Sequence, residues 1–158
     1  MLIYLLFYEE KLLYMPDHLL AHAIQICHEK NVRFTAVRQQ VFTLMATHRG
    51  AISAYELLEK LQSFDSKAKP PTIYRALDFL LDNHFIHRIE SLNAYLMCSH
   101  FGCEHVMQLL ICDKCKTVIE LNDSVIDDVF SNKAEQFGFE ITNKVLEAHG
   151  VCKKCLDA

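Results

Sequence analysis

The sequence predicts an α+β protein, in which an N-terminal winged helix-turn-helix domain is followed by a small α/β domain with a three-stranded sheet and one long helix. Two observations favour this architecture. Helix-like segments and one hairpin-like segment fill residues 16–98, whereas strand-like segments surround a single helical segment in residues 99–158. Four of the seven cysteines also form two Cys-x-x-Cys pairs in the second region. Such pairs are typical of metal thiolates in a reducing compartment, so a secreted disulfide framework is disfavoured.

Residues 1–15 form an apolar N-terminal extension. The apolar run at 1–8 is interrupted by charged residues at 9–11, far short of the roughly 20 residues that a membrane span requires. It also lacks the basic start and the small-residue cleavage site of a signal peptide, so we expect no membrane partner. Met15 is an alternative start, which would make residues 1–14 an upstream extension. Otherwise they form an apolar helix that docks on the body or on a second subunit.

Helical periodicity predicts two helices before residue 50. Apolar residues recur at intervals of three and four over residues 18–30, which places them on one helix face. A second helix is expected after Thr35, a residue type favoured as an N-cap. The apolar positions of the two helices are Leu19, Leu20, Ala23, Ile24 and Cys27, and then Val37, Val41, Phe42, Leu44 and Met45.

A capping box predicts the start of a third helix. The Ser53 hydroxyl is placed to accept from the amide of Glu56, whose carboxylate returns to the Ser53 amide. This helix directs Leu57, Leu58 and Leu61 inward, and the polar stretch 63–69 ends it.

A fourth helix is expected immediately after Pro70 and Pro71, because the first turn of a helix has no amide partners to lose. Residues 85–90 and 94–98 then predict a two-stranded hairpin. Helix, helix and hairpin is the order of a winged helix-turn-helix domain. The helix has a buried stripe of Ile73, Ala76, Leu77, Leu80 and Leu81 and an outer face of Thr72, Tyr74, Arg75, Asp78 and Asp82.

The second region alternates strands with one helix. Residues 106–112, 117–121 and 139–146 are strand-like, and residues 124–137 have a helical period that Gly138 ends. The expected buried face of this helix consists of Val125, Ile126, Val129, Phe130 and Phe137.

The net charge of −4 is confined to the second region. Residues 1–90 hold 10 basic and 10 acidic groups, whereas residues 91–158 hold 6 basic and 10 acidic groups. Any binding of nucleic acid must therefore come from local patches of the first region rather than from global charge.

The two Cys-x-x-Cys pairs, Cys112 with Cys115 and Cys152 with Cys155, predict a closed zinc site with four thiolates. Such a site joins the end of the chain to the middle of the second domain, and structural zinc supplies on the order of 10 kcal/mol of folding free energy. The alternative is two dithiols or four ordinary buried cysteines.

A second donor group mixes the nitrogen, sulfur and oxygen ligands that suit zinc. A metal bound by all its members would clamp the hairpin to the second domain. The alternative is that its histidine and glutamate are surface residues and its cysteine a buried thiol. The group consists of His87, Cys98, His105 and Glu120, with His100 and Cys103 as auxiliary ligands.

The fourth helix carries the main candidates for DNA contact. We expect Tyr74 and Arg75 in its first turn, because the N-terminal residues of a recognition helix usually meet base edges, and Arg75 suits bidentate pairing with guanine. Tyr55 suits a thymine methyl group or a phosphate. The alternative is an ordinary solvated helix face. The remaining DNA-binding candidates are Thr72, Arg33, Arg38, Lys67 and Lys69.

Five motifs together resemble the zinc uptake regulators of the ferric uptake regulator family, over about residues 17–157. They are residues 53–55, 70–77, 85–87, 112–115 and 147–152. The resemblance implies a dimeric winged-helix repressor, with a DNA-binding domain at 16–98 and a zinc-binding dimerisation domain at 99–158. It implies two zinc ions per subunit, a structural ion on the four paired cysteines and a regulatory ion on the mixed donor group. Tyr55 and Arg75 match the base-contacting positions of the family.

The resemblance leads us to expect a cytoplasmic, zinc-responsive repressor without catalytic activity or a small-molecule substrate. A homodimer would bind palindromic double-stranded operators of zinc-uptake genes when it is zinc-loaded. Met107 and Leu109 stand where the iron and peroxide sensors of the family generally carry a His-rich run, which argues against iron. Two alternatives stay open, namely a family sensor of another metal or of peroxide, and a zinc-dependent protein-interaction module or thiol oxidoreductase. We expect His149 to be a packing or hydrogen-bonding residue.

Overall fold

The computed structural model describes residues 16–48, 50–98, 106–121, 123–142 and 144–157. The apolar extension at 1–15 therefore lies outside the described residues. The chain divides into two compact units between residues 102 and 103. No helix in the described part of the chain has both the length and the hydropathy needed to cross a bilayer.

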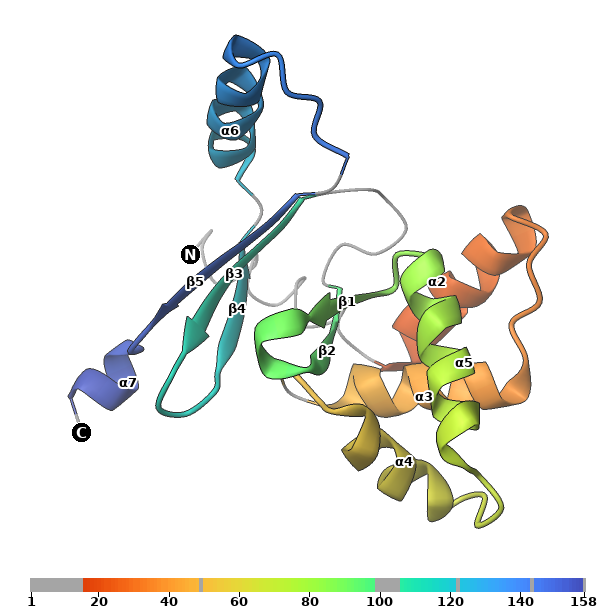
Figure 1. The fold of residues 1–158 in the computed structure, drawn as a ribbon. Coiled ribbons are helices and arrows are strands. Elements are labelled where there is room, and N and C mark those ends of the chain that lie inside the picture. Colours follow the sequence, from red (N-terminus) through yellow and green to blue (C-terminus); the bar gives the residue numbers. More distant parts are fainter. Residues whose placement is uncertain (1–15, 49, 99–105, 122, 143, 158) are drawn as a thin grey trace, which may run out of the picture. The chain divides into compact units, whose positions relative to one another are not determined.

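The first unit consists of four helices followed by a hairpin (Figure 1). Its strands pair antiparallel, with His87 opposite Leu96, and an isolated bridge joins Ile52 to Tyr95. This order confirms the predicted winged helix-turn-helix fold. The elements are α2 (Pro16–Glu29), α3 (Ala36–Thr47), α4 (Ala54–Gln62), α5 (Pro70–Asp82), β1 (Ile86–Ile89), the 3₁₀ turn η1 (Glu90–Leu92) and β2 (Ala94–Met97).

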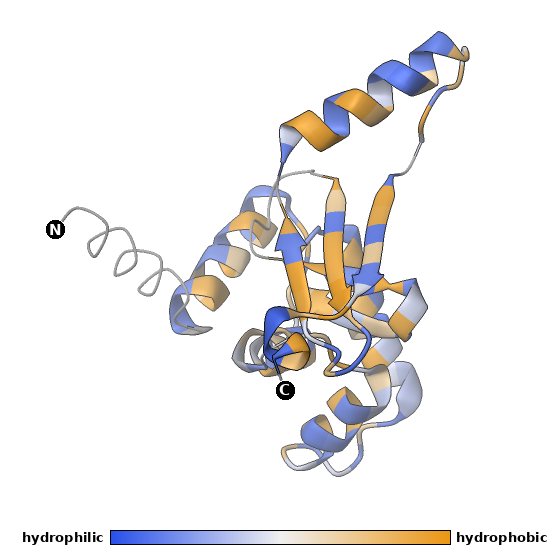
Figure 2. Cartoon of the chain, turned by 90° about the vertical axis from the view of Figure 1, so that its left-hand side faces the viewer, coloured by the Kyte–Doolittle hydropathy of each residue, from blue (hydrophilic) through white to orange (hydrophobic). Residues whose placement is uncertain are grey.

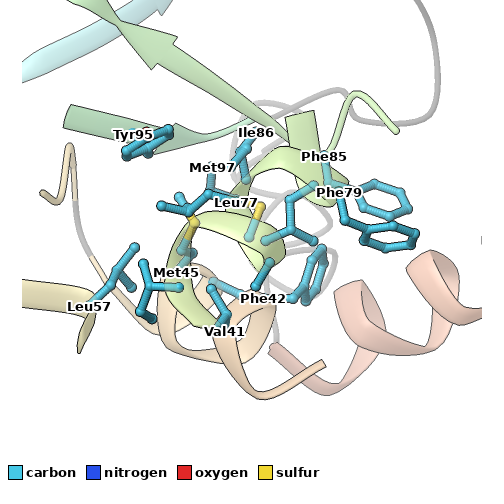
Figure 3. Close-up of a cluster of buried hydrophobic side chains, with 14 of the residues drawn as sticks. Val41, Phe42, Met45, Leu57, Leu77, Phe79, Phe85, Ile86, Tyr95 and Met97 are labelled. Carbon is cyan, nitrogen blue, oxygen red and sulfur yellow. The ribbon is translucent and has the colours of Figure 1, made fainter. Parts of the chain in front are cut away.

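The core of the first unit lies where α3 and α5 meet the hairpin (Figure 3). Phe42 and Phe85 are completely buried, and their rings meet edge to face with centroids 5.7 Å apart. The Phe34 ring stacks on Phe79 at 5.6 Å. Aromatic pairs of this kind contribute about 0.5–1.5 kcal/mol each beyond the burial of their area. This aromatic cluster holds α5 and the hairpin in fixed positions on α3.

Three details of the first unit differ from the sequence-based expectations. Ile24 and Val37 were expected in the core, but both are exposed, because each lies on a side of its helix that the rest of the unit does not cover. Both prolines belong to α5, which begins at Pro70, so Tyr74 and Arg75 lie in its second turn rather than its first. Thr35 does precede α3, but its side chain makes no capping hydrogen bond.

The capping box of α4 is confirmed. The Ser53 amide donates to a carboxylate oxygen of Glu56 at 2.9 Å, the Ser53 hydroxyl donates to the same oxygen at 2.7 Å, and the Glu56 amide donates to the hydroxyl at 3.2 Å. These bonds from the hydroxyl and the amide of Ser53 hold the pKa of Glu56 below its usual range.

We expect Ser53→Ala to lower the free energy of unfolding of the first unit by about 1 kcal/mol at neutral pH, because α4 loses its cap. A carboxyl group with a lowered folded pKa stabilises above its unfolded value, about 4.3 for Glu, and this contribution is lost as the pH falls through the folded pKa. Thermal unfolding at pH 7 and pH 3 measures both effects. The exposed Ser66→Ala is the control. A destabilisation of equal size at the two pH values would contradict the role of Glu56.

The second unit is a mixed three-stranded sheet with a helix at each end (Figure 1). The strand order is β4-β3-β5, with β3 antiparallel to β4 and parallel to β5. This confirms the predicted three-stranded sheet and single long helix. The elements are β3 (Met107–Cys112), β4 (Val118–Leu121), α6 (Ser124–Gln136), β5 (Val145–Gly150) and the short α7 (Lys153–Leu156).

Two predictions about the second unit were wrong. The last strand begins at Val145 rather than at 139, and the preceding residues form a return segment that carries the exposed Phe139. The face of α6 that was expected to be buried is exposed in the single chain, with Val125 at 65% and Phe137 at 84%, and Ile126, Val129 and Phe130 are exposed as well. Figure 2 shows hydrophobic residues recurring along this helix. Periodicity reveals an apolar face, but it does not reveal whether the same chain covers it.

Candidate metal centre and nucleic-acid interface

The four cysteines of the two Cys-x-x-Cys pairs lie together in the second unit. Their sulfur atoms are all within 4.8 Å of one another, and the sulfurs of Cys115 and Cys152 are 3.6 Å apart. Cys112 ends β3, Cys115 lies in the turn before β4, and Cys152 and Cys155 lie at the start of α7 and within it. Four sulfur ligands at such separations suit a tetrahedral Zn²⁺ ion.

The parallel pairing of β3 with β5 brings the two cysteine pairs together. Its register places Cys112 opposite Gly150, and the amide of Asp113 donates to the Gly150 carbonyl at 2.8 Å. Cys152 follows two residues later, and its amide donates to the sulfur of Cys112 at 3.3 Å. A turn in which Lys116 adopts a positive φ of 59° carries the chain from β3 back into β4. The backbone therefore brings the sulfurs together without a disulfide.

The four thiols differ in their pKa values. The amides of Cys115 and Cys152 donate to the sulfur of Cys112 and lower its pKa to about 6. A hydrogen bond with the Thr117 hydroxyl lowers the pKa of Cys115. The sulfur of Cys155 instead shares hydrogen bonds with those of Cys115 and Cys152, which raises its pKa to about 12. Four crowded thiols resist losing all their protons together unless a cation replaces them, so this donor set fits a dication.

Side chains outside the cysteines join the two pairs. The Lys114 ammonium donates to the Cys155 carbonyl at 3.0 Å, across 41 residues of sequence. His149 Nδ1 lies 3.2 Å from a carboxylate oxygen of Asp113, and its Nε2 lies 3.5 Å from one of Glu147. The predicted hydrogen-bonding role of His149 is therefore confirmed. The sequence analysis missed the link from Lys114, because nothing in the spacing pairs a lysine with a carbonyl so far along the chain.

The members of the mixed donor group belong to both units of the chain. In the first unit, His87 on β1 and Cys98 just after β2 hold a ligand nitrogen and a sulfur within 4.8 Å of each other. Cys98 is buried, and its amide donates to the Phe85 carbonyl at 3.0 Å. In the second unit, Glu120 is half-buried on β4 opposite Leu109. The remaining candidates His100, Cys103 and His105 lie outside the described residues.

The candidate nucleic-acid interface lies on α4 and α5. Tyr55 in the first turn of α4 is 70% exposed, and Tyr74 and Arg75 on α5 are exposed as well. Thr72 is half-buried and accepts a hydrogen bond of 3.4 Å from the amide of Lys69. Aromatic and guanidinium groups on a helix-turn-helix suit contacts with base edges and phosphates.

The other basic candidates are not equivalent. Lys67 and Lys69 are exposed in and after the turn between α4 and α5, whereas Arg38 is partly buried. The guanidinium of Arg38 lies 3.9 Å from the centroid of the Phe79 ring and donates to the carbonyl of Arg33. Arg38 therefore has a packing role that its sequence position did not reveal, and its contact with DNA stays a prediction.

The sequence model of the Ferric uptake regulator family matches residues 29–149. The chain belongs to the ferric uptake regulator family. Among its relatives in this family, the zinc uptake regulation protein of Escherichia coli K12 is 44% identical over 142 residues, which cover 89% of this chain and 83% of that protein. The zinc uptake regulation protein of Mycobacterium tuberculosis H37Rv is 28% identical over 78% of this chain and 95% of that protein.

Solved structures of the ferric uptake regulator family have the same fold. A zinc uptake regulator in complex with zinc and DNA is 43% identical and aligns with a TM-score of 0.86, over 90% of this chain and 96% of that chain. The holo form of XcZur is 37% identical with a TM-score of 0.80, over 88% of this chain and 97% of that chain. The similarity therefore extends over both units.

Proposed function

We propose that this member of the ferric uptake regulator family is a zinc-responsive, dimeric transcriptional repressor. It binds palindromic double-stranded operators of zinc-uptake genes when zinc-loaded. It works in the cytoplasm, catalyses no reaction and takes no small-molecule substrate. The observation that carries this proposal is the similarity, at 43% identity over 90% of the chain, to a zinc uptake regulator in complex with zinc and DNA.

Cys112, Cys115, Cys152 and Cys155 hold the structural zinc ion of each subunit. Thiolates are the ligands of closed structural zinc sites, and the crowding of the four sulfurs supports this assignment. The ion neutralises thiolates that repel one another without it. Bound there, it would stabilise the existing pairing of β3 with β5 through the residues at their ends.

His87, Cys98, His105 and Glu120 hold the second, regulatory zinc ion. The proximity of His87 to Cys98 supports half of this ligand set, and the donor chemistry of the other two suits the same metal. His100 and Cys103 are reserve ligands. Because the four residues come from both sides of the division between the units, zinc bound to all of them favours one arrangement of the DNA-binding unit.

Zinc acts on DNA binding by changing the population of this arrangement. The shift in population is limited by the difference in zinc affinity between the competent and the incompetent arrangements. A change from 1:99 to 99:1 requires a preference of roughly 5.5 kcal/mol. Three or four metal–ligand bonds made in only one arrangement are of the right order to supply it.

The second unit is the dimerisation domain. A contiguous exposed apolar face such as that of α6 is uncommon on a soluble monomer and usually marks an interface. A symmetric dimer presents two copies of α5 to the two halves of a palindrome. The local basic groups of the first unit then provide the DNA contacts that the net charge of the whole chain does not.

Sensors of peroxide or iron are the nearest alternatives. The relatives of those types are less similar than the zinc uptake regulation protein of Escherichia coli, at 26% identity to a peroxide-responsive repressor of Staphylococcus epidermidis and 32%, over 64% of this chain, to a ferric uptake regulation protein of Vibrio anguillarum. Met107 and Leu109 on β3 also offer no metal-ligand nitrogen. The zinc assignment is therefore favoured over both alternatives.

A gel shift with operator-like palindromic DNA tests the proposed function. We expect the zinc-loaded chain to bind, and a chelator that removes only the regulatory zinc to weaken binding. In the zinc-loaded state, Arg75→Ala should lose about 1–3 kcal/mol of affinity and relax specificity at one base pair. Lys67→Ala should weaken binding to all sequences about equally. Equal binding with and without regulatory zinc would refute the proposal.

A further inference from the structure

We propose that Lys144 is a positioning residue for dimerisation. It fixes the direction in which α6 leaves its sheet and so places the apolar side of that helix for a second copy of the chain. The inference rests on the proposed function in one respect, namely that the chain acts as a dimer.

The Lys144 ammonium is nearly enclosed, since its side chain is only 9% exposed. It donates to the backbone carbonyl of Asp127 at 3.2 Å, to the hydroxyl of Ser131 at 2.8 Å and to the carboxylate of Asp127. An ammonium group has three N–H donors, and here each of them has an acceptor. A lysine that is buried and fully bonded in this way is uncommon, and it holds the groups around it in one geometry.

The position of Lys144 makes it a tie between two elements. It immediately precedes β5, whereas Asp127 and Ser131 lie on successive turns of α6. A second tie starts from β3, where the buried Gln108 amide donates to the carbonyl of Asp123 at 2.9 Å. Asp123 is the N-cap of α6 and accepts from the amide of Val125 at 2.8 Å. Both ties act on the part of α6 between its N-cap and Ser131, and they set its direction.

The same lysine lies near the apolar side of the helix. Its Nζ lies 5.9 Å from the centroid of the Phe130 ring, and Phe130 lines an apolar hollow of about 410 Å³ between α6 and the return segment. Val129, Phe137, Phe139 and Ile141 also line this hollow. The tie therefore places the lysine beside the exposed apolar side of the helix whose direction it sets.

A second copy of the chain is the occupant that this surface fits. In a twofold dimer the same patch occurs on both partners, so an apolar helix side covers its own counterpart. The surface lies in the unit that the proposed function assigns to dimerisation. Two helices pack in such an arrangement only within a narrow range of crossing angles, which makes the affinity depend on the direction of α6.

Loss of the ammonium should release α6 without unfolding the sheet. The side chain of Asp127 is 36% exposed, so water can hydrate its carboxylate once the Lys144 ammonium is removed. The four cysteines lie at the other end of the sheet and make no contact with the tie in the described part of the chain. We therefore expect dimer affinity to change while zinc content is kept.

Sedimentation velocity of the full zinc-loaded chain, without DNA, tests the inference. Lys144→Met keeps the apolar part of the side chain and removes the charge. We expect it to raise the Kd of the dimer at least about tenfold, which is equivalent to about 1.4 kcal/mol. Asp127→Asn, which is almost isosteric, should act in the same direction. The double variant should lose little more than the stronger single one, because both remove one interaction. Lys30→Met, at the exposed lysine in the turn after α2, is the charge-matched control and should leave the Kd unchanged.

The outcomes separate the inference from the proposed function. A lowered unfolding temperature with an unchanged dimer Kd means that Lys144 is merely structural, and it overturns the inference. A wild-type chain that is monomeric yet binds operator in response to zinc overturns the inference and the dimeric part of the proposed function, whereas the proposed zinc response stands. A dimer that depends on Lys144 but ignores zinc when it meets DNA overturns the proposed function alone.

Discussion

Cys112→Ser removes the structural zinc ion and unfolds the sheet of the second unit, while the helical unit stays folded. This is the largest effect that we expect. Structural zinc contributes on the order of 10 kcal/mol to folding, which exceeds the total stability of many small domains. The sulfur of Cys112 also accepts from the amide that leads into α7. Its loss therefore removes a metal ligand and a link to the second cysteine pair.

Hydrogen exchange and zinc content together measure this result. We expect Cys112→Ser to lose one zinc ion per chain and the amide protection of β3, β4 and β5. Protection of α3 and α5 should remain, because their core is built without any of the four cysteines. Cys27→Ala is the matched control, since this buried cysteine belongs to the core of the first unit. A Cys112→Ser chain with wild-type zinc content and a protected sheet would contradict the four-thiolate site.

His87→Ala uncouples DNA binding from zinc without unfolding either unit. His87 is half-buried on β1, and its backbone pairing with Leu96 survives truncation of the side chain. The proposed regulatory site loses a ligand, so zinc no longer favours the binding-competent arrangement. Allosteric coupling of about 5- to 150-fold is typical, and the variant should lose most of it. Its operator affinity at saturating zinc should fall to that of the wild-type chain without regulatory zinc.

Fluorescence anisotropy with labelled operator DNA, titrated at buffered free zinc, measures the coupling. His28→Gln is the control, because this exposed histidine lies in the last turn of α2 and belongs to neither proposed site. Zinc content should show that the variant retains the four-thiolate ion. If His87→Ala keeps the full zinc response, the regulatory ligand set is wrong.

Local signals in the sequence predicted most of the first unit. The capping box at Ser53 and Glu56 and the two prolines in the first turn of α5 act through neighbouring atoms, so a short stretch of sequence is enough to predict them. The clustering of the two cysteine pairs could also be predicted, because a zinc site with four thiolates requires this spacing within each pair. The parallel register of β3 with β5 could not be predicted, since it is set by contacts between segments far apart in the chain.

The errors lie where the decisive partner is distant or belongs to another chain. The apolar residues of α6 were assigned to a core, but the single chain leaves them exposed. Lys144 carried no sequence signal, because a lysine before a strand is usually solvated and only the fold brings it to Asp127. The packing of Arg38 on Phe79 was missed for the same reason. Such contacts follow from tertiary structure and cannot be read from periodicity.

The place of β5 beside β3 has a consequence for biosynthesis. A ribosome delivers β3 well before β5, so one edge of the central strand stays unpaired while the intervening residues are made. The second pair of proposed zinc ligands, Cys152 and Cys155, arrives later still. A nascent chain interrupted before Cys152 would carry a finished helical unit and a second unit that cannot retain its metal. With zinc on the four proposed ligands, metal loading would therefore distinguish completed chains from unfinished ones.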